Sequence, residues 1–366
     1  PVTGYAFARS CRRRCVVEAM KEIFTYSVLK EVQTRCFLFF EEQESGFQER
    51  ILSEENSFTV IDTKVKSTIS DLQPLYRKAY PVSAGEYCKS IDRVFELYTV
   101  LQALSNRVQM INVIGGGALI DLVGYALATS FQDLKMRAIP TTPFSQLYGF
   151  YQRSFYIHFD RKINLLGVFG IPQELWIVPF FLKTFAVEDI RKAHAVCFAT
   201  ALGFQEHFYY LVEKSLSLLI NNQTNWTVFY ELLREHHYLR AKFSLEYRLI
   251  PGESMGFLLQ TATGFQMDYV DAFIKGLMLE AYISFKLGII EESSFEMIRK
   301  TLGQIGLEDK LPPQRQVDLQ TLFSLIDEKK AIKIQVIKGF GNSQETTVSA
   351  GIIEHILKEY YFGKQS

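Results

Sequence analysis

The nine residues Val113–Asp121 read V-I-G-G-G-A-L-I-D and are the most informative stretch of the chain. An apolar run that predicts a buried strand leads into three glycines, and helical spacing follows them. Glycine has no Cβ, so backbone N–H groups there can approach a phosphate, and a helix that begins there directs the positive end of its dipole to the same place. We interpret the stretch as a strand, turn and helix that can hold a dinucleotide. A tight turn with a packing role alone fits the same letters, because the spacing is not G-x-G-x-x-G.

Other apolar bursts with strand character surround this stretch. They lie at Cys36–Phe40, Phe58–Asp62, Val108–Ile114 and Met136–Ile139. Helix-like segments separate them, which predicts a parallel sheet covered by helices on both faces. The first part of the chain is therefore expected to be an α/β, Rossmann-like nucleotide-binding domain.

The pattern changes after Pro179. Long segments with helical spacing follow, at Val187–Leu219, Trp226–Leu249 and Tyr269–Leu287. A chain of 366 residues also exceeds the size at which one hydrophobic core keeps growing. We predict an α/β dinucleotide-binding domain over residues 1–179 and an all-α or mostly helical domain over residues 180–366.

Charge and cysteine content limit the classes of partner and compartment. Lys plus Arg and Asp plus Glu both number 40, and the short run Arg12–Arg14 is read as a solvated helix face, so nucleic acid is not an expected partner. Five scattered cysteines make neither a disulfide framework nor a zinc-finger spacing, which favours a reducing, cytoplasmic setting. The apolar stretch Trp176–Leu182 is shorter than the ~20 residues that cross a bilayer. Neither a membrane span nor a signal peptide is expected.

Three further segments accompany the glycine stretch. They are Ala84–Ser90 (A-G-E-Y-C-K-S), Pro140–Thr142 (P-T-T) and Phe181–Thr184 (F-L-K-T). In this order and at these distances the set resembles 3-dehydroquinate synthase and its relatives, the sugar phosphate cyclases. The likeness extends to Val60–Asp62, Gly124, Gly167, Phe169, Pro172 and Asp327–Lys330.

The resemblance implies the dehydroquinate synthase-like fold, with NAD and a divalent metal, usually zinc, as cofactors, and a homodimer. It also implies an NAD site in the α/β domain. The residues implied to line that site are Asp62, Glu86, Lys89, Gly115, Gly116, Gly117, Asp121, Thr141, Thr142, Phe181, Leu182, Lys183 and Thr184. Carboxylates there can accept ribose hydroxyls, Lys89 can offset phosphate charge, and threonine hydroxyls can donate hydrogen bonds.

The sequence departs from the family where the metal would bind. The family's ligands are a Glu in R-x-G-x-A-E-V-I-K, a His in L-N-F-G-H-T-F-G-H and a His in H-G-E-A-V. The matching positions here hold Val196, Glu253 and Tyr269. Valine has no ligand atom, and one glutamate beside a phenol is a poor zinc site. We therefore expect no metal.

The substrate side departs as well. The family's D-S-S-V-G-G-K, which supplies an Asp and a Lys, matches Tyr148–Ser154 (Y-G-F-Y-Q-R-S), and its K-N pair is only approximated by Lys162 and Asn164. The small-molecule ligand is therefore expected to be less polar than a sugar phosphate. The candidate catalytic residues are Lys162, Asn164, Glu253 and Tyr269. A tyrosine such as Tyr269 can donate a proton to a developing alkoxide.

Two hypotheses about function follow. In the first, the chain is a divergent enzyme that keeps NAD and performs a metal-independent reaction of a biosynthetic pathway, and it is not a working 3-dehydroquinate synthase. In the alternative, it is a catalytically inactive pseudo-cyclase that acts as a structural or regulatory partner. Its aromatic replacements would then fill the old pocket or form an apolar contact surface. These residues are Phe144, Tyr148, Phe150, Tyr151, Phe155 and Tyr156.

Overall fold

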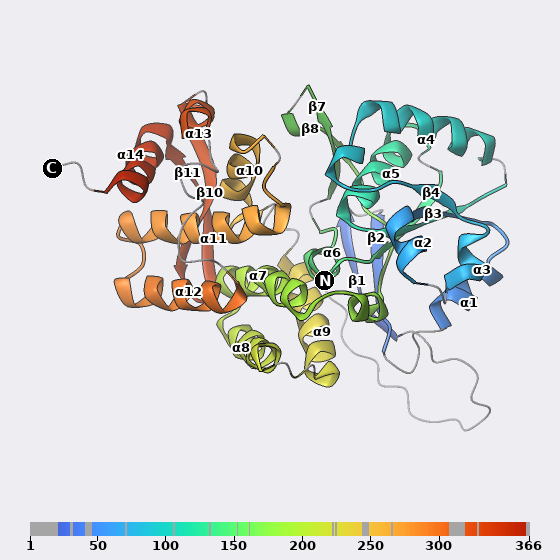
Figure 1. Cartoon of the computed structure of the whole chain (residues 1–366), viewed down its shortest axis with the longest axis horizontal. Coiled ribbons are helices and arrows are strands. Elements are labelled where there is room, and N and C mark those ends of the chain that lie inside the picture. Colours follow the sequence, from blue (N-terminus) through green and yellow to red (C-terminus); the bar gives the residue numbers. More distant parts are fainter. Residues whose placement is uncertain are drawn as a thin grey trace. The chain divides into compact units, whose positions relative to one another are not determined.

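The chain folds into two compact units in the computed structural model, residues 1–158 with 164–184 and residues 159–163 with 185–366 (Figure 1). The structure describes residues 21–29, 32–40, 46–69, 72–104, 107–131, 133–151, 153–160, 162–221, 223, 225–243, 249–264, 266–306, 319–327 and 329–363. The run Arg12–Arg14 lies outside these residues. Within them, no helix is both long and apolar enough to cross a bilayer.

The first unit is built on a seven-stranded sheet with the strand order β1-β2-β9-β6-β5-β3-β4. Its strands are β1 Lys21–Leu29, β2 Val32–Leu38, β3 Ser57–Asp62, β4 Tyr80–Val82, β5 Met110–Gly115, β6 Lys135–Pro140 and β9 Glu174–Ile177. The edge pair β1 and β2 is antiparallel, and the other neighbours are parallel. The predicted parallel sheet is confirmed, and the four predicted strands are β2, β3, β5 and β6.

Helices connect these strands. They are α1 Gly46–Ser53, α2 Thr63–Thr68, α3 Gln73–Tyr76, η3 Glu86–Cys88, α4 Ile91–Leu104, α5 Gly117–Ser130, α6 Pro143–Tyr148 and η4 Pro179–Thr184. The central strands β5 and β6 are buried over all but their first residue, as expected for parallel strands covered on both faces. Aromatic side chains such as Phe39, Phe47 and Trp176 fill the core on one side of the sheet.

The carboxyl ends of β3, β5 and β6 meet at one edge of the sheet. Ile61 pairs with Ile114, and Gly115 pairs with Pro140. Parallel sheets bind ligands at this edge, because the loops that leave the strands converge there. The fold therefore brings Asp62, the glycine turn and Thr141 together.

A separate hairpin follows α6 and forms its own two-stranded sheet from β7 Ser154–Phe159 and β8 Lys162–Phe169 (Figure 1). The first strand buries Phe155 and Ile157. The Phe155 ring lies so close to α5 that a Cβ built on Gly124 would be 2.4 Å from it. The hairpin is thus packed against α5 through a position where only glycine fits.

The second unit is mostly helical. Its helices are α7 Val187–Phe204, α8 Glu206–Ile220, α9 Trp226–Phe243, α10 Glu253–Ala262, α11 Tyr269–Lys286, α12 Glu292–Ile305, α13 Leu319–Asp327 and α14 Ala350–Phe362. It also contains an antiparallel hairpin of β10 Ala331–Gly339 and β11 Asn342–Ser349, which an all-helical expectation does not include. The apolar alternation of β10 (A-I-K-I-Q-V-I) is typical of a strand, and its inward residues join the core formed with α10, α11, α13 and α14.

Helices α10 and α11 cross at a glycine contact. A Cβ built on Gly276 would lie 2.2 Å from the carbonyl oxygen of Gly252 and 2.3 Å from the nitrogen of Gly256. One turn further along α11, the Glu280 carboxylate accepts hydrogen bonds from Gly252 N at 2.7 Å and Met255 N at 3.2 Å. Burial raises the pKa of Glu280 to about 8, although these backbone donors oppose the shift. Helix α10 has no side-chain cap of its own at Gly252. Glu280 on the neighbouring helix α11 therefore provides that cap.

This crossing gives a prediction about stability. The methyl group of Gly276→Ala would clash with backbone atoms of α10, which cannot rotate away. We therefore expect the free energy of unfolding to fall by at least about 1–3 kcal/mol. Gly303→Ala on α12 is the matched control, because its Cβ would meet no atom within 4 Å, and it should be neutral or stabilising by up to about 1 kcal/mol. Urea unfolding measures both. Equal stability of the two variants would contradict the close crossing.

Candidate functional site

The glycine turn at the end of β5 is tightly packed on two of its three residues. A Cβ on Gly115 would lie 2.7 Å from Leu119 Cδ2 and 3.3 Å from Asp62 Cβ. On Gly116 it would lie 3.3 Å from Thr142 Cγ2. Packing within the unit therefore explains these two glycines without any ligand.

Gly117 is different, because a Cβ built on it would meet no atom within 4 Å. It is the first residue of the 14-residue helix α5, whose N-cap, Gly116, makes no side-chain hydrogen bond to it. The first N–H groups of a helix have no partner within the helix, and they lie at the positive end of its dipole. The turn therefore offers backbone donors beside open space, which is the arrangement that binds a pyrophosphate.

The predicted polar neighbours of the turn serve first as local caps. Asp62 accepts a hydrogen bond from Lys64 N at 2.9 Å and so caps α2. Thr141 N donates to Gly115 O at 3.0 Å, and Thr142 forms a capping box with Ser145 at the start of α6. These bonds fix the loops around the turn and hold the predicted residues of β3, β5 and β6 at one edge.

A buried ion pair lies next to this edge. Lys89 Nζ donates to Asp121 Oδ2 at 2.9 Å and to Asn164 Oδ1 at 2.6 Å, and it lies 3.8 Å from Glu86 Oε2. Burial opposes the charge of Lys89, but the carboxylates of Asp121 and Glu86 outweigh it, so the pKa of Lys89 is raised. The positive charge is therefore balanced inside the unit, and Lys89 points inward.

His158, which no sequence motif singles out, completes this network. Its Nε2 lies 3.2 Å from Glu86 Oε2, and its Nδ1 accepts a hydrogen bond from Asn164 N at 3.1 Å. Burial alone would raise the pKa of Glu86, but Lys89 and His158 outweigh burial and hold it below its usual value. Glu86 is thus an ionised carboxylate whose side chain is 40% exposed, and it is the exposed end of the network.

The segment Phe181–Thr184 divides into two halves. Phe181 and Leu182 are buried, and the Phe181 ring packs against Phe47 at 5.6 Å. Lys183 and Thr184 are exposed, and Thr184 Oγ1 donates to Phe181 O at 2.8 Å. In this segment, Lys183 and Thr184 are the residues whose side chains a ligand can reach.

The four candidate catalytic residues are placed in different surroundings. Asn164 is bound to Lys89 in the first unit, whereas Lys162 is exposed at the start of β8. Glu253 and Tyr269 begin helices α10 and α11 of the second unit. The K-N pair expected from the resemblance is therefore not one side-chain cluster. The catalytic roles of all four stay predictions.

The positions that match the family's metal ligands do not fit a metal ion. Val196 is fully buried in α7. Glu253 uses Oε2 to accept a hydrogen bond from Ile250 N at 2.8 Å, and the Tyr269 ring packs against Phe257 with centroids 5.9 Å apart. Over the part of the chain that the structure describes, no three His, Cys, Asp or Glu side chains gather to hold a cation. These three positions offer one carboxylate, which is already engaged.

The aromatic side chains that replace the family's polar substrate-binding residues are packed inside the first unit and are not exposed on its surface. None of the six, from Phe144 to Tyr156, is classed as exposed. Cβ atoms built on Gly149 and Gly167 would lie 2.3 Å and 2.7 Å from the Tyr151 and Tyr156 rings. These rings thus cover the backbone of their own unit.

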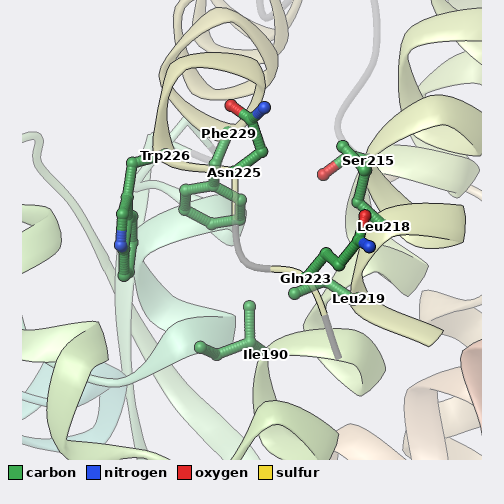
Figure 2. A pocket seen from close by; sticks show the side chains of 8 residues that line it. All are labelled: Ile190, Ser215, Leu218, Leu219, Gln223, Asn225, Trp226 and Phe229. Atoms are coloured by element: carbon green, nitrogen blue, oxygen red, sulfur yellow. The ribbon is translucent and has the colours of Figure 1, made fainter. Parts of the chain in front are cut away.

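A small pocket lies among α7, α8 and α9 of the second unit, and Figure 2 shows the side chains around it. It is lined by Ile190, Ser215, Leu218, Leu219, Gln223, Asn225, Trp226 and Phe229. Its volume of about 10 Å³ suits one water molecule and no cofactor. Beside it, the His194 ring bonds to Ile190 O through Nδ1 at 2.8 Å and to Ser215 Oγ through Nε2 at 3.0 Å.

His194 makes the stability of the second unit depend on pH. Burial lowers the pKa of His194 from 6.5 to about 4. Between pH 6.5 and pH 4 the histidine is therefore protonated in the unfolded chain and neutral in the folded chain. The stabilisation is present above pH 6.5 and is lost as the pH falls toward 4, on the order of 3 kcal/mol in all. Urea unfolding of the wild type and of His194→Asn at several pH values measures this difference. A stability difference that does not change between pH 7 and pH 4.5 would show that His194 is not held neutral.

Comparisons with known proteins agree with this architecture. A family profile described as 3-dehydroquinate synthase N-terminal matches residues 79–192. The 3-dehydroquinate synthase of Acetivibrio thermocellus is 22% identical over 263 residues, which are 69% of this chain and 72% of that protein.

Two solved structures share the fold over nearly their whole length. ValA, a 2-epi-5-epi-valiolone synthase from Streptomyces hygroscopicus with NAD+ and Zn2+ bound, has a TM-score of 0.74 at 19% identity and covers 90% of this chain and 97% of its own. A 2-deoxy-scyllo-inosose synthase, complexed with carbaglucose-6-phosphate, NAD+ and Co2+, has a TM-score of 0.69 at 14% identity and covers 92% and 99%. The resemblance read from the sequence is confirmed, and so is the fold class.

Proposed function

We propose that this chain, which is similar to 3-dehydroquinate synthases over residues 79–192 and beyond and shares the fold of sugar phosphate cyclases, is a divergent sugar phosphate cyclase-like enzyme that binds NAD and works without a metal. It belongs to a biosynthetic pathway, acts on a small molecule less polar than a sugar phosphate, and is not a working 3-dehydroquinate synthase. We expect a homodimer, as the resemblance implies, in a cytoplasmic setting, as the scattered cysteines indicate.

The observation that carries the proposal is the open first turn of α5. Packing accounts for Gly115 and Gly116, but nothing in the unit requires a glycine at position 117, where an added Cβ meets no atom. A bound pyrophosphate over the N–H groups of this turn explains the absence of a side chain. ValA and the inosose synthase, which share the fold, are described with NAD+ bound, which supports the same assignment.

Several groups would hold the dinucleotide. The turn Gly115–Gly117 would bind its pyrophosphate, Thr142 would flank the turn, and Asp62 and Glu86 would accept ribose hydroxyls. When bound, NAD supplies a hydride acceptor for a secondary alcohol and a donor for the resulting ketone. Lys162, Asn164, Glu253 and Tyr269 remain the candidate catalytic residues, and among them Tyr269 could donate a proton to a developing alkoxide.

The chemistry of the residues at the three matching positions supports the metal-independent part of the proposal. In the family, the cation polarises the alkoxide and the carbonyl, which stabilises the developing charge by several kcal/mol. Val196 and Tyr269 cannot replace the carboxylate and the imidazole of such a site. The original substrate would therefore react far more slowly here.

The second candidate function is an inactive pseudo-cyclase that acts as a structural or regulatory partner. One observation favours it. The residues that match the family's substrate-binding segment pack their rings against their own backbone, as Tyr151 does at Gly149. A protein of this kind keeps the fold but turns over neither substrate nor cofactor.

Two assays test the proposal together. Purified protein with NAD, zinc or cobalt, and the seven-carbon phosphate substrate of 3-dehydroquinate synthase should show no turnover at an ordinary enzymatic rate. The same protein should bind NAD and NADH in a fluorescence titration. Turnover of that substrate would contradict the loss of the original reaction. No binding at millimolar dinucleotide would contradict the NAD site and leave the pseudo-cyclase as the better interpretation.

A further inference from the structure

We infer that His158 is a positioning residue of the NAD site, which fixes Glu86 and Asn164 without contacting the ligand itself. This inference rests on the proposed NAD binding and deepens it, because it assigns a role to a residue outside the motifs of the family resemblance. His158 lies on β7, far in sequence from Glu86, and its side chain is 17% exposed.

The contacts of His158 join two separate segments. Its backbone N donates to Lys89 O at 2.7 Å, which ties β7 to the turn that carries Glu86 and Lys89. Its ring then reaches Glu86 Oε2 on one side and Asn164 N on the other, at 3.2 Å and 3.1 Å. The histidine is therefore a three-point link between the Glu86–Lys89 turn and the hairpin.

The ring's protonation follows from these partners. Nδ1 faces the backbone N–H of Asn164, so it must be an acceptor and carry no proton. The proton of the neutral ring is then on Nε2 and points at the Glu86 carboxylate. The ring donates to Glu86 and accepts from Asn164 at the same time, which no aliphatic or phenyl side chain can do.

Each partner needs this support. Asn164 has a left-handed backbone with φ of +48°, a conformation that asparagine adopts more readily than most residues but that still costs energy without supporting bonds. Its N–H is held by His158 and its Oδ1 by Lys89. Lys89 Nζ donates to both Asp121 and Asn164. If Asn164 lost its backbone conformation, Lys89 would lose the second of these hydrogen bonds.

Glu86 is the group through which this positioning reaches a ligand. It is the partly exposed carboxylate of the network, whereas Asp121 is buried. A glutamate without the histidine would rotate among several side-chain conformations, and ordering it would cost binding free energy. His158 pre-orders Glu86 for a ligand hydroxyl.

Three substitutions separate the two ring contacts. His158→Gln keeps a donor at the Nε2 position, His158→Asn keeps an acceptor at the Nδ1 position, and His158→Phe keeps neither. At metal sites, loss of a residue that orients a ligand group typically costs about 10–100-fold in affinity or activity, and we expect an effect at the lower end of that range here. We expect His158→Phe and His158→Asn to weaken NAD binding about tenfold and His158→Gln to restore it to within about threefold.

A double-mutant cycle that combines His158→Phe with Glu86→Gln tests whether His158 acts on NAD binding through Glu86. If His158 acts through Glu86, adding His158→Phe to Glu86→Gln should change NAD affinity by less than about twofold, because the contact is already lost. Nitrogen NMR of wild-type His158 should show the Nε2-protonated form. Thermal unfolding of each variant measures any loss of stability. If His158 had only a structural role, its variants would be less stable and His158→Gln would not restore NAD affinity.

The outcomes are distinguishable. NAD binding by the wild type together with unchanged affinity in His158→Phe would overturn the positioning role and leave the proposed NAD site intact. Fully additive effects in the cycle, or a proton found on Nδ1, would overturn it too. A wild-type chain that binds no NAD would overturn both.

Discussion

Replacing Gly117 with aspartate is expected to weaken NAD binding at least about a hundredfold, since like charges brought together at a binding site cost several kcal/mol. The new carboxylate would occupy the open space over the first turn of α5, where the pyrophosphate is proposed to lie. Without NAD the substitution should be harmless or stabilising. Its Cβ meets no atom within 4 Å, and an acidic residue in the first turn suits the helix dipole.

Gly351→Asp is the matched control for this experiment. Gly351 also lies in the first turn of a helix, α14, and a Cβ there also meets no atom within 4 Å. Calorimetric titration should give wild-type NAD affinity for Gly351→Asp and no measurable binding for Gly117→Asp, with both variants unfolding at or above the wild-type temperature. Wild-type affinity in Gly117→Asp would contradict the assignment of this turn to the pyrophosphate.

The second large effect concerns Arg137 on the central strand β6. Its guanidinium donates to Glu174 at 2.7 Å, to both oxygens of Glu54 at 2.7 and 2.9 Å, and to Asn112 at 2.9 Å. It also lies 4.0 Å from the centre of the Trp176 ring. Removing Arg137 would leave Glu54 without its cation and would leave the buried Glu174 with Arg35 alone, so Arg137→Met should cost about 3–5 kcal/mol in the free energy of unfolding.

Arg93→Met provides the surface comparison. Arg93 pairs with Glu96 at 2.6 Å, with side chains 41% and 54% exposed, and exposed pairs contribute about 0–1 kcal/mol. Urea unfolding followed by tryptophan fluorescence measures both variants, and Trp176 reports directly on the site of the first. A loss of less than 1 kcal/mol in Arg137→Met would show that this network does not hold the sheet together.

The sequence predicts the first unit well because its signals are local. Continuous apolar runs indicate β2, β3, β5 and β6, and the glycine turn marks the start of α5. The hairpin β7–β8 carries weaker signals, since β8 is nowhere fully buried. The hairpin β10–β11 lies within helical surroundings, and its pairing joins residues up to 18 positions apart, such as Ala331 with Ser349. Periodicity within one window does not reveal such a partner.

The candidate site is predictable only in part. The resemblance indicates Glu86, Lys89 and Asp121, but not that Lys89 turns inward to meet Asp121 and Asn164, which lie 32 and 75 positions away. His158 has no motif, and a single histidine on an apolar strand is usually read as part of the core. Contacts across such distances depend on the fold, so the structure is needed to find them.

The most direct test of a retained NAD site without a metal site is calorimetric titration with NAD of the chain dialysed against EDTA, with and without one equivalent of zinc restored. We expect one NAD bound per chain with the same affinity in both samples. Binding that requires the zinc, or no binding in either sample, would contradict an NAD site that is retained without a metal site.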